Sequence, residues 1–308
     1  MEKELIEPVR SFNRTVTQRI GALYDEYLSR DRPLGASRVL WEINAGIDVR
    51  SIREKLDLDA GYLSRLLRQL EGENLVRVRP APYDHRVRFV ELTKLGRGER
   101  AELDRRSDEL AWFMLEPLSD EQRERLIDAM ATVEKLLTEA LVEIRVEDPE
   151  SRAALLCMNA YYAELDARFD AGFHPEQSLT AETDDLNGQS GLLLVAFLRN
   201  EPVGCGAVLF QSETLGMVKR MWVAPDARGL GIGRRILGEL ESRARSQGIK
   251  SLRLDTNRHL EEAINLYQTS GFNEVGAFNK EPYAHHWFEK PLSKTAPRPH
   301  KSAKTKRK

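Results

Sequence analysis

A glycine-rich stretch around residues 228–234 has the residue types and spacing of an anion-binding loop. Pro225 ends the apolar run before it, and an amphipathic segment begins within the glycines. Glycines leave backbone amides uncovered, and amides at a helix N-terminus bind phosphate groups. The positively charged side chains of Arg228 and Arg234 could bind phosphate oxygens. We therefore predict a pyrophosphate site formed by these residues: Arg228, Gly229, Leu230, Gly231, Ile232, Gly233 and Arg234.

Two common phosphate-binding motifs do not fit this stretch. A Walker loop needs Gly-Lys-Ser or Gly-Lys-Thr, which does not occur, and a Rossmann fingerprint needs a glycine where Arg234 or Ile236 stands. The pattern Arg-x-x-Gly-x-Gly after a Val-x-Pro strand end does fit, and it resembles motif A of the GNAT acetyltransferases. That family binds the pyrophosphate of acetyl-CoA at this motif. The simpler alternative is a glycine-rich loop that only turns the chain.

A second pattern strengthens the resemblance. Ala-x-x-Leu-Tyr-x-x-x-Gly-Phe, which contains Tyr267 and Gly271, is similar to the second GNAT signature, and the likeness covers about residues 146–292. It implies that an amine attacks the thioester of acetyl-CoA. In that family a strand amide meets the developing oxyanion, here one from Met221, Trp222 or Val223. Tyr267 would protonate the departing CoA thiolate, and the alternative is a core aromatic side chain.

Some positions depart from the GNAT pattern. Leu260 stands where Asn is frequent, and Met217 where Glu is frequent, so the general base is unassigned. Four other residues are candidates, each also readable as structural or solvated: Glu164, Glu213, His285 and His286. Two adjacent histidines alone do not make a metal site, and no metal is predicted.

The elements around the two signatures predict an α+β domain with a mixed, mainly antiparallel sheet. A helix capped by Ser151 precedes a polar loop over residues 170–190. A strand meander then leads into the glycine loop, over residues 192–198, 202–210 and 215–223. Helices from residues 232 and 261 alternate with a strand over 251–255, and Gly271 stops the last helix.

In the first half, helical patterns over residues 5–28, 37–43 and 49–56 precede a fourth helix that Asp59 would cap. Its leucines recur at the spacing of one buried face. The opposite face carries polar side chains that could reach DNA, namely Tyr62, Ser64, Arg65, Arg68 and Gln69. Two short helices joined by a tight turn indicate a helix-turn-helix, and the alternative is an ordinary solvated helix face.

A predicted β-hairpin follows that helix. Residues 75–79 and 86–92 alternate in polarity around a polar loop, as the wing of a winged helix does. Residues 61–97 contain eight Lys and Arg against four Asp and Glu, although the whole chain has a net charge of −2. This local positive charge predicts double-stranded DNA as a partner.

The order of these elements, together with Leu92-Thr93-x-x-Gly96, resembles the MarR family of transcriptional regulators over residues 5–144. We therefore expect an all-α winged helix-turn-helix domain with a β-wing. The resemblance implies that Arg86 of the Asp84-x-Arg86 pair enters the minor groove. It also implies a homodimer built by helices from both ends of the domain.

With 308 residues the chain predicts two domains, over residues 1–145 and 146–293, and a basic tail over 294–308. Its two cysteines exclude a disulfide framework. No apolar run reaches membrane-spanning length and the start is charged, so we expect a soluble cytoplasmic protein without membrane contact. The tail holds seven Lys and Arg and no acid, which predicts disorder, and it either adds DNA affinity or solubilises the end.

Together these patterns predict a bifunctional transcriptional regulator and N-acetyltransferase that uses acetyl-CoA and an amine of a small molecule or protein. The alternative is a transcription factor whose second domain only senses acetyl-CoA or a metabolite. The retained Tyr267 favours catalysis, and the missing base positions count against it.

Overall fold

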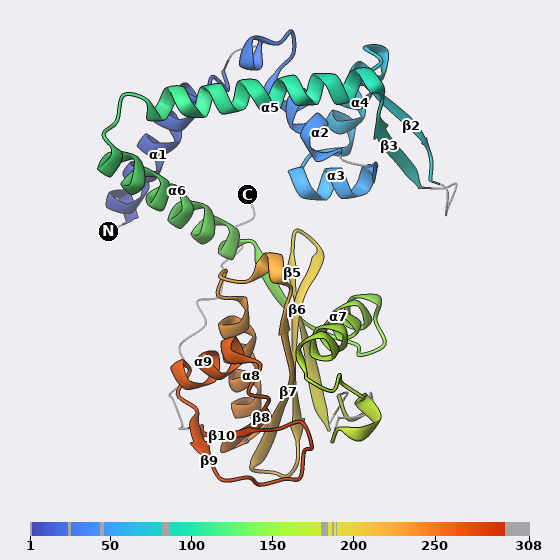
Figure 1. Ribbon diagram of the computed structural model, residues 1–308, viewed down its shortest axis with the longest axis vertical. Coiled ribbons are helices and arrows are strands. Elements are labelled where there is room, and N and C mark those ends of the chain that lie inside the picture. The colour runs from blue at the N-terminus through green and yellow to red at the C-terminus, as the bar shows by residue number, and fades with distance from the viewer. Residues whose placement is uncertain are drawn as a thin grey trace, which may run out of the picture. The chain divides into compact units, whose positions relative to one another are not determined.

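The computed structural model describes residues 2–23, 26–43, 46–81, 87–179, 184–186, 188 and 190–292. Asp84, Arg86 and the predicted tail lie outside these residues. The chain divides into two compact units, Met1–Thr132 and Val133–Lys308 (Figure 1). This division falls inside helix α6 (Asp120–Ala140), whereas the boundary predicted from the sequence follows residue 145. None of the described helices is both long and apolar enough to cross a bilayer.

The first unit packs helices around a small sheet. Its three strands are antiparallel in the order β1-β3-β2, which adds one short strand to the predicted hairpin. The helices are α1 (Glu2–Arg19), α2 (Leu34–Glu42), α3 (Val49–Leu56), α4 (Ala60–Gly72), α5 (Lys94–Leu115) and the start of α6, and the strands are β1 (Ile47–Asp48), β2 (Val76–Pro80) and β3 (Arg88–Leu92).

The prediction of one helix over residues 5–28 was wrong. Helix α1 ends at Arg19, and a separate 3-10 turn covers Tyr27–Ser29. Gly21 has a φ of +70°, a left-handed conformation that glycine adopts freely and that ends a right-handed helix. The apolar periodicity of the sequence continued past this point and hid the break.

The second helix of the helix-turn-helix, α4, has the N-cap and the buried apolar face that the sequence predicts. The Asp59 carboxylate accepts hydrogen bonds from the amides of Gly61 and Tyr62 at 2.9 and 3.0 Å, which confirms it as the N-cap of α4. Four leucines on one face of α4 are buried in the core of the unit: Leu63, Leu66, Leu67 and Leu70. The polar face of α4 is thereby turned outward.

The second unit is built on a seven-stranded sheet in the order β4-β5-β6-β7-β8-β10-β9. Neighbouring strands are antiparallel except β7 and β8, which confirms the predicted mixed sheet. The strands are β4 (Val142–Glu147), β5 (Gly191–Leu198), β6 (Glu201–Phe210), β7 (Leu215–Val223), β8 (Ser251–Thr256), β9 (Asn273–Val275) and β10 (His286–Pro291).

Helices cover both faces of this sheet (Figure 1). One face packs against α7 (Arg152–Arg168) and the other against α8 (Ile232–Ser246) and α9 (Glu261–Thr269). The alternation of side chains along β5 explains this arrangement, because Leu193 and Val195 join the core beneath α7 while Leu194 and Ala196 join the core beneath α8. Sequence patterns in β5 therefore specify a sheet buried on both sides.

Gly96 shows how closely elements of the first unit approach. It lies in the first turn of α5, and its amide donates to Thr93 Oγ1 at 3.0 Å. A Cβ atom at Gly96 would stand 1.9 Å from the carbonyl oxygen of Leu75. Because that obstacle is backbone, it cannot rotate away, so the Leu-Thr-x-x-Gly motif needs its glycine.

We predict that Gly96→Ala lowers the free energy of unfolding by about 1–3 kcal/mol through overpacking. Gly98, two residues further along the same helix, has nothing within 4 Å of its Cβ position. Gly98→Ala should therefore raise stability by roughly 0.5–1 kcal/mol, since alanine favours the helix. Urea unfolding of the three proteins tests both signs, and equal effects of the two substitutions would contradict the packing argument.

Candidate functional site

The two parallel strands in the middle of the sheet separate along their length. Strands β7 and β8 pair only through Leu215–Ser251, Gly216–Leu252 and Met217–Arg253. Beyond these pairs β7 continues to Val223 and β8 to Thr256 without pairing to each other. The carboxyl ends of the two strands therefore form a split whose inner edges carry backbone groups without a sheet partner.

A β-bulge in β7 accompanies the split. Cys205 opposes Trp222 and Ala207 opposes Lys219, so Gly206 alone faces the two residues Arg220 and Met221. Arg220 has a φ of +57°, which is uncommon for a residue with a side chain and marks local backbone strain. Gly206 makes room for the bulge, since a Cβ there would lie 2.5 Å from Met221 Sδ. A bulge bends the strand that carries it, so this one changes the direction of β7 in the part that does not pair with β8.

An ion pair joins the two strands just beyond their last paired residues. Lys219 Nζ lies 3.1 and 3.0 Å from the two carboxylate oxygens of Asp255, and both side chains are mostly buried. Asn279 Nδ2 donates to Asp255 Oδ2 at 3.0 Å, and Trp287 Nε1 donates to Asn279 Oδ1 at 2.7 Å. These contacts tie the split to the strand next to β8.

A pocket of about 410 Å³ opens on the side of the split that faces the glycine loop. Gly229 and Gly231 have φ values of +81° and +66°, and Gly231 is the N-cap of α8. Leu230 packs against the core instead of lining this pocket. The other predicted residues of the loop and strand do line it, together with Tyr267: Met221, Trp222, Val223, Arg228, Gly229, Gly231, Ile232, Gly233 and Arg234.

Arg228 and Glu164 form an ion pair in the wall of this larger pocket. Arg228 Nη2 lies 2.7 Å from Glu164 Oε1, and Trp222 Nε1 donates to Glu164 Oε2 at 2.9 Å. Arg168 also donates to Glu164, at 3.0 Å. Burial alone would raise the pKa of Glu164, but these hydrogen bonds outweigh it and hold that pKa below its usual value. Glu164 is therefore a carboxylate that positions Arg228.

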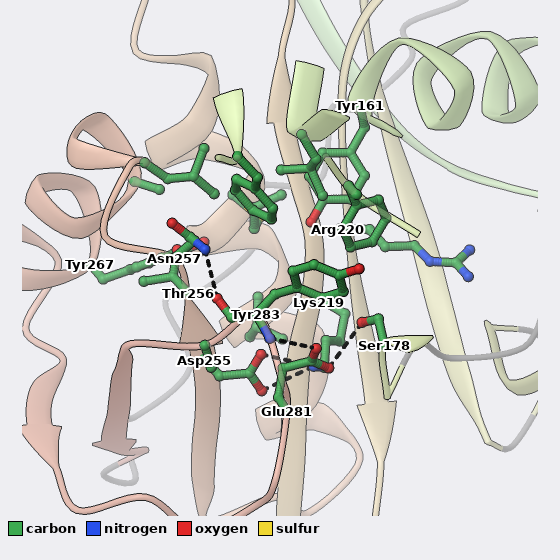
Figure 2. A pocket seen from close by; sticks show the side chains of 18 residues that line it. Tyr161, Ser178, Lys219, Arg220, Asp255, Thr256, Asn257, Tyr267, Glu281 and Tyr283 are labelled. Atoms are coloured by element: carbon green, nitrogen blue, oxygen red, sulfur yellow. Dashed lines mark hydrogen bonds and ion pairs between the residues drawn. The ribbon is translucent and has the colours of Figure 1, made fainter. Parts of the chain in front are cut away.

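A smaller pocket of about 80 Å³ lies on the other side of the split (Figure 2). Six residues line both pockets and form their junction, namely Tyr161, Leu165, Met221, Leu260, Ala263 and Tyr267. Tyr267 is buried, and burial followed by the negative charge of Asp255 raises its pKa well above the usual value. Its hydroxyl therefore keeps its proton at neutral and moderately alkaline pH.

The polar face of α4, which was predicted to reach DNA, is largely exposed in the first unit. Arg65 stands over the Tyr62 ring at 5.8 Å, Arg68 Nε donates to the Ser64 carbonyl at 3.2 Å, and Gln69 Nε2 donates to Glu73 at 3.0 Å. Arg32, itself buried, lies 3.0 Å from Glu73 and pairs with Glu99 of α5. The end of α4 is thereby anchored to α5, so its arginines are presented from a fixed helix.

Comparison with known proteins bears on both units. The sequence profile of the acetyltransferase (GNAT) family matches residues 158–272. An IAA acetyltransferase from Azospirillum brasilense is 42% identical over 104 residues, which span 32% of this chain and 67% of that protein. The chain belongs to the GNAT family of acetyltransferases. The predicted GNAT resemblance of the second half is thus confirmed.

The first unit has its own relatives. An uncharacterised HTH-type transcriptional regulator of Bacillus subtilis, YdgJ, is 36% identical over 86 residues, which span 28% of this chain and 52% of that protein. The crystal structure of a mutant MarR from Escherichia coli complexed with operator DNA is 27% identical, with a TM-score of 0.37, and the match covers 45% of this chain and 96% of that one. The chain thus joins a region similar in sequence to an HTH-type regulator to a GNAT domain.

The structure tests the four candidate bases of the GNAT domain. Glu164 is held by Arg228, and Glu213 is exposed in the turn between β6 and β7. His286 pairs with Glu274 at 2.7 Å, and neither it nor His285 is among the residues that line the two pockets. None of the four is therefore a suitable base in this arrangement. Among the described residues, no group of three His, Cys, Asp or Glu side chains is arranged to hold a metal ion.

Several pocket residues escaped the sequence reasoning. Tyr161, Lys219, Asp255 and Glu281 line the smaller pocket but come from segments far apart in the sequence. Asn257 also lines the smaller pocket, and its Nδ2 donates to the Tyr283 carbonyl at 2.7 Å. The sequence offered two separate hints of this site. One is the group of four aromatic residues within 161–173, and the other is the Glu-x-Tyr pair at 281–283.

We predict that Lys219→Met lowers the free energy of unfolding by about 3–5 kcal/mol, because Asp255 then stays buried without its cation. Adding Asp255→Asn to that variant should restore part of the loss, since the uncompensated charge is removed. Urea unfolding of the single and double variants in the full chain provides the comparison. A double variant less stable than Lys219→Met would show that charge compensation does not govern this pair.

Proposed function

We propose that the GNAT domain transfers an acetyl group from acetyl-CoA to an amine, and that the first unit binds double-stranded DNA as a transcriptional regulator. The observation that carries the enzymatic part is the position of Tyr267, a buried and protonated hydroxyl at the junction of two pockets. One pocket contains an anion-binding loop, and the other is available for an acceptor.

The larger pocket has the features that acetyl-CoA needs. Amides at Gly231 and Gly233 lie at the start of α8, where the helix dipole favours a pyrophosphate. A pantetheine arm in the split would meet the inner edge of β7, which has no strand partner there. The acetyl carbonyl would then lie near the bulge, where an amide of residues 221–223 stabilises the oxyanion. The name of the Azospirillum relative supports acetyl as the group transferred.

The reaction needs one proton at the leaving group. A neutral amine attacks the thioester carbonyl, the C–N bond forms, the C–S bond breaks, and the CoA thiolate takes the proton of Tyr267. The raised pKa of Tyr267 ensures that this proton is present before the reaction. The proton that the amine loses leaves through solvent in the smaller pocket, and solvent returns a proton to Tyr267 before the next turnover.

We predict that Tyr267→Phe keeps the ring packing and acetyl-CoA affinity but lowers turnover by about 10²–10⁴. Turnover is measured by thiol release across a panel of amines, and affinity by calorimetry. Gly231→Asp serves as the matched binding variant, since its carboxylate would repel the pyrophosphate and weaken acetyl-CoA binding. Wild-type turnover that Tyr267→Phe leaves intact would keep the enzymatic proposal but assign protonation of the leaving group to water or another residue.

The proposal for DNA rests on the outer face of α4. Arg65 and Arg68 are exposed there, and the name of the Bacillus relative is that of an HTH-type regulator. We propose that this face enters the major groove, that Arg86 reaches the minor groove, and that two copies act together. Exposed apolar side chains on the terminal helices of the unit support a homodimer: Leu5, Ile6, Val9, Phe12, Trp112, Phe113, Ile127 and Met130. A monomer in sedimentation equilibrium would contradict this assembly.

We predict that Arg65→Ala weakens binding to the cognate operator by about 1–3 kcal/mol if it reads a base edge, and that specificity relaxes at that base pair. Arg105 of α5 is a matched control, because it is also exposed but already pairs with Glu102 and Glu109. Arg105→Ala should leave DNA affinity unchanged. Fluorescence anisotropy at matched salt measures both variants, and equal losses would mean that only general charge is involved.

A further inference from the structure

The acceptor side of the split carries a charge pattern that defines a class of amine. We propose that the acceptor is a slender aliphatic diamine: one amine reacts at the junction of the two pockets, and the second, protonated amine is bound by Glu281. This inference rests on the proposed acetyl transfer, because it names the acceptor of that reaction.

Glu281 is a buried carboxylate whose hydrogen-bond partners in the described part of the chain are all neutral. It is 7% exposed, and its Oε2 accepts hydrogen bonds from Ser178 Oγ at 2.9 Å and from the Leu179 amide at 2.7 Å. Among the described residues, its Oε1 has only a long contact, 3.4 Å, from the Tyr283 amide. No Lys, Arg or His of the described chain forms an ion pair with it. A buried carboxylate without a cation is costly, so an ammonium group in the pocket would complete this site.

The other acid of the pocket contrasts with Glu281. Asp255 is already neutralised by Lys219 at 3.0 Å. Arg220 also lines the pocket, but its Nη1 lies 3.7 Å from Met158 Sδ, and Figure 2 shows the guanidinium directed away from the other labelled side chains. Glu281 is therefore the group that selects for positive charge in the acceptor.

The place of Glu281 indicates a second amine. It lines the smaller pocket only, whereas Tyr267 and Met221 line both pockets. In Figure 2 Glu281 and Asp255 lie toward one end of the drawn pocket and Tyr161 toward the other. An amine that reacts beside Tyr267 is thus separated from the carboxylate. A molecule that satisfies both positions needs two amino groups joined by a spacer.

The walls of the pocket define that spacer. Phe169, Phe173 and Tyr283 pack together, with ring centroids 5.7 Å apart for Phe169–Tyr283 and 4.9 Å for Phe173–Tyr283. These interlocked rings offer apolar surface to methylene groups and a π face to a cation. The volume of about 80 Å³ is roughly half that of a cavity that holds benzene in another protein. This volume favours a narrow alkyl chain over a sugar ring.

The test compares 1,4-diaminobutane with butylamine, which has the same chain and lacks the second cation. For the wild-type full-length protein we expect kcat/KM to favour the diamine by about 10- to 100-fold, the value of a hydrogen bond to a charged group. Glu281→Gln should remove this preference, because it should lower kcat/KM for the diamine at least tenfold more than kcat/KM for butylamine. Glu274→Gln, which removes an exposed carboxylate on β9, should keep the preference.

A second variant covers the case in which Glu281→Gln does not fold. Glu281→Asp keeps the charge but withdraws it by one methylene, so the preferred diamine should shift from 1,4-diaminobutane to 1,5-diaminopentane. An equal effect of Glu281→Gln on both amines, or no diamine preference in the wild type, would overturn the inference.

Direct binding separates this inference from the proposed function. If no amine is acetylated, calorimetric titration of 1,4-diaminobutane into the CoA-loaded protein still tests Glu281. Binding that Glu281→Gln abolishes would support the diamine site although the catalytic proposal fails. No binding to the wild-type protein would overturn the diamine site itself.

Discussion

The bulge at Arg220 and Met221 sets the geometry on which the GNAT domain depends. It lies in the part of β7 that no longer pairs with β8, three residues beyond the last pair, and the Lys219–Asp255 ion pair joins the two strands just before it. Both pockets open from this separation, and the glycine loop follows directly from the end of β7. A regular strand would continue to pair with β8 and leave no space between them.

Neighbouring residues hold the strained backbone of that bulge in place. Arg220 adopts its left-handed conformation next to Gly206, and Cys205 Sγ lies 3.3 Å from the Arg220 carbonyl oxygen. Strained residues persist only where packing determines them, and they gather at functional sites. The first unit uses buried charge for a similar end, since Arg32 connects Glu73 at the end of α4 with Glu99 of α5. In each unit a buried contact fixes the element that carries the proposed function.

Local sequence patterns predicted a large part of this protein. The glycine loop, the N-cap Asp59 and the bounds of α3, α8 and β7 could be read directly, because each depends on neighbours within a few residues. The break after Arg19 was missed because apolar spacing continued across Gly21. Long-range contacts were out of reach. Glu281 meets Ser178 across more than a hundred residues of sequence, and Glu164 was considered as a base because nothing nearby in the sequence indicates Arg228.

Strand β7 pairs with β8 only over its first three residues, so its backbone amides have two different environments. Its first three residues pair with β8, whereas the later paired residues, Val218, Lys219, Trp222 and Val223, pair with β6 and not with β8. Amides that lack a partner exchange with solvent deuterium more readily than amides inside a ladder. Protection should therefore change abruptly along this single strand. A ligand that occupies the split takes the place of the missing neighbour, so isotope exchange at β7 reports occupancy without any chemical turnover.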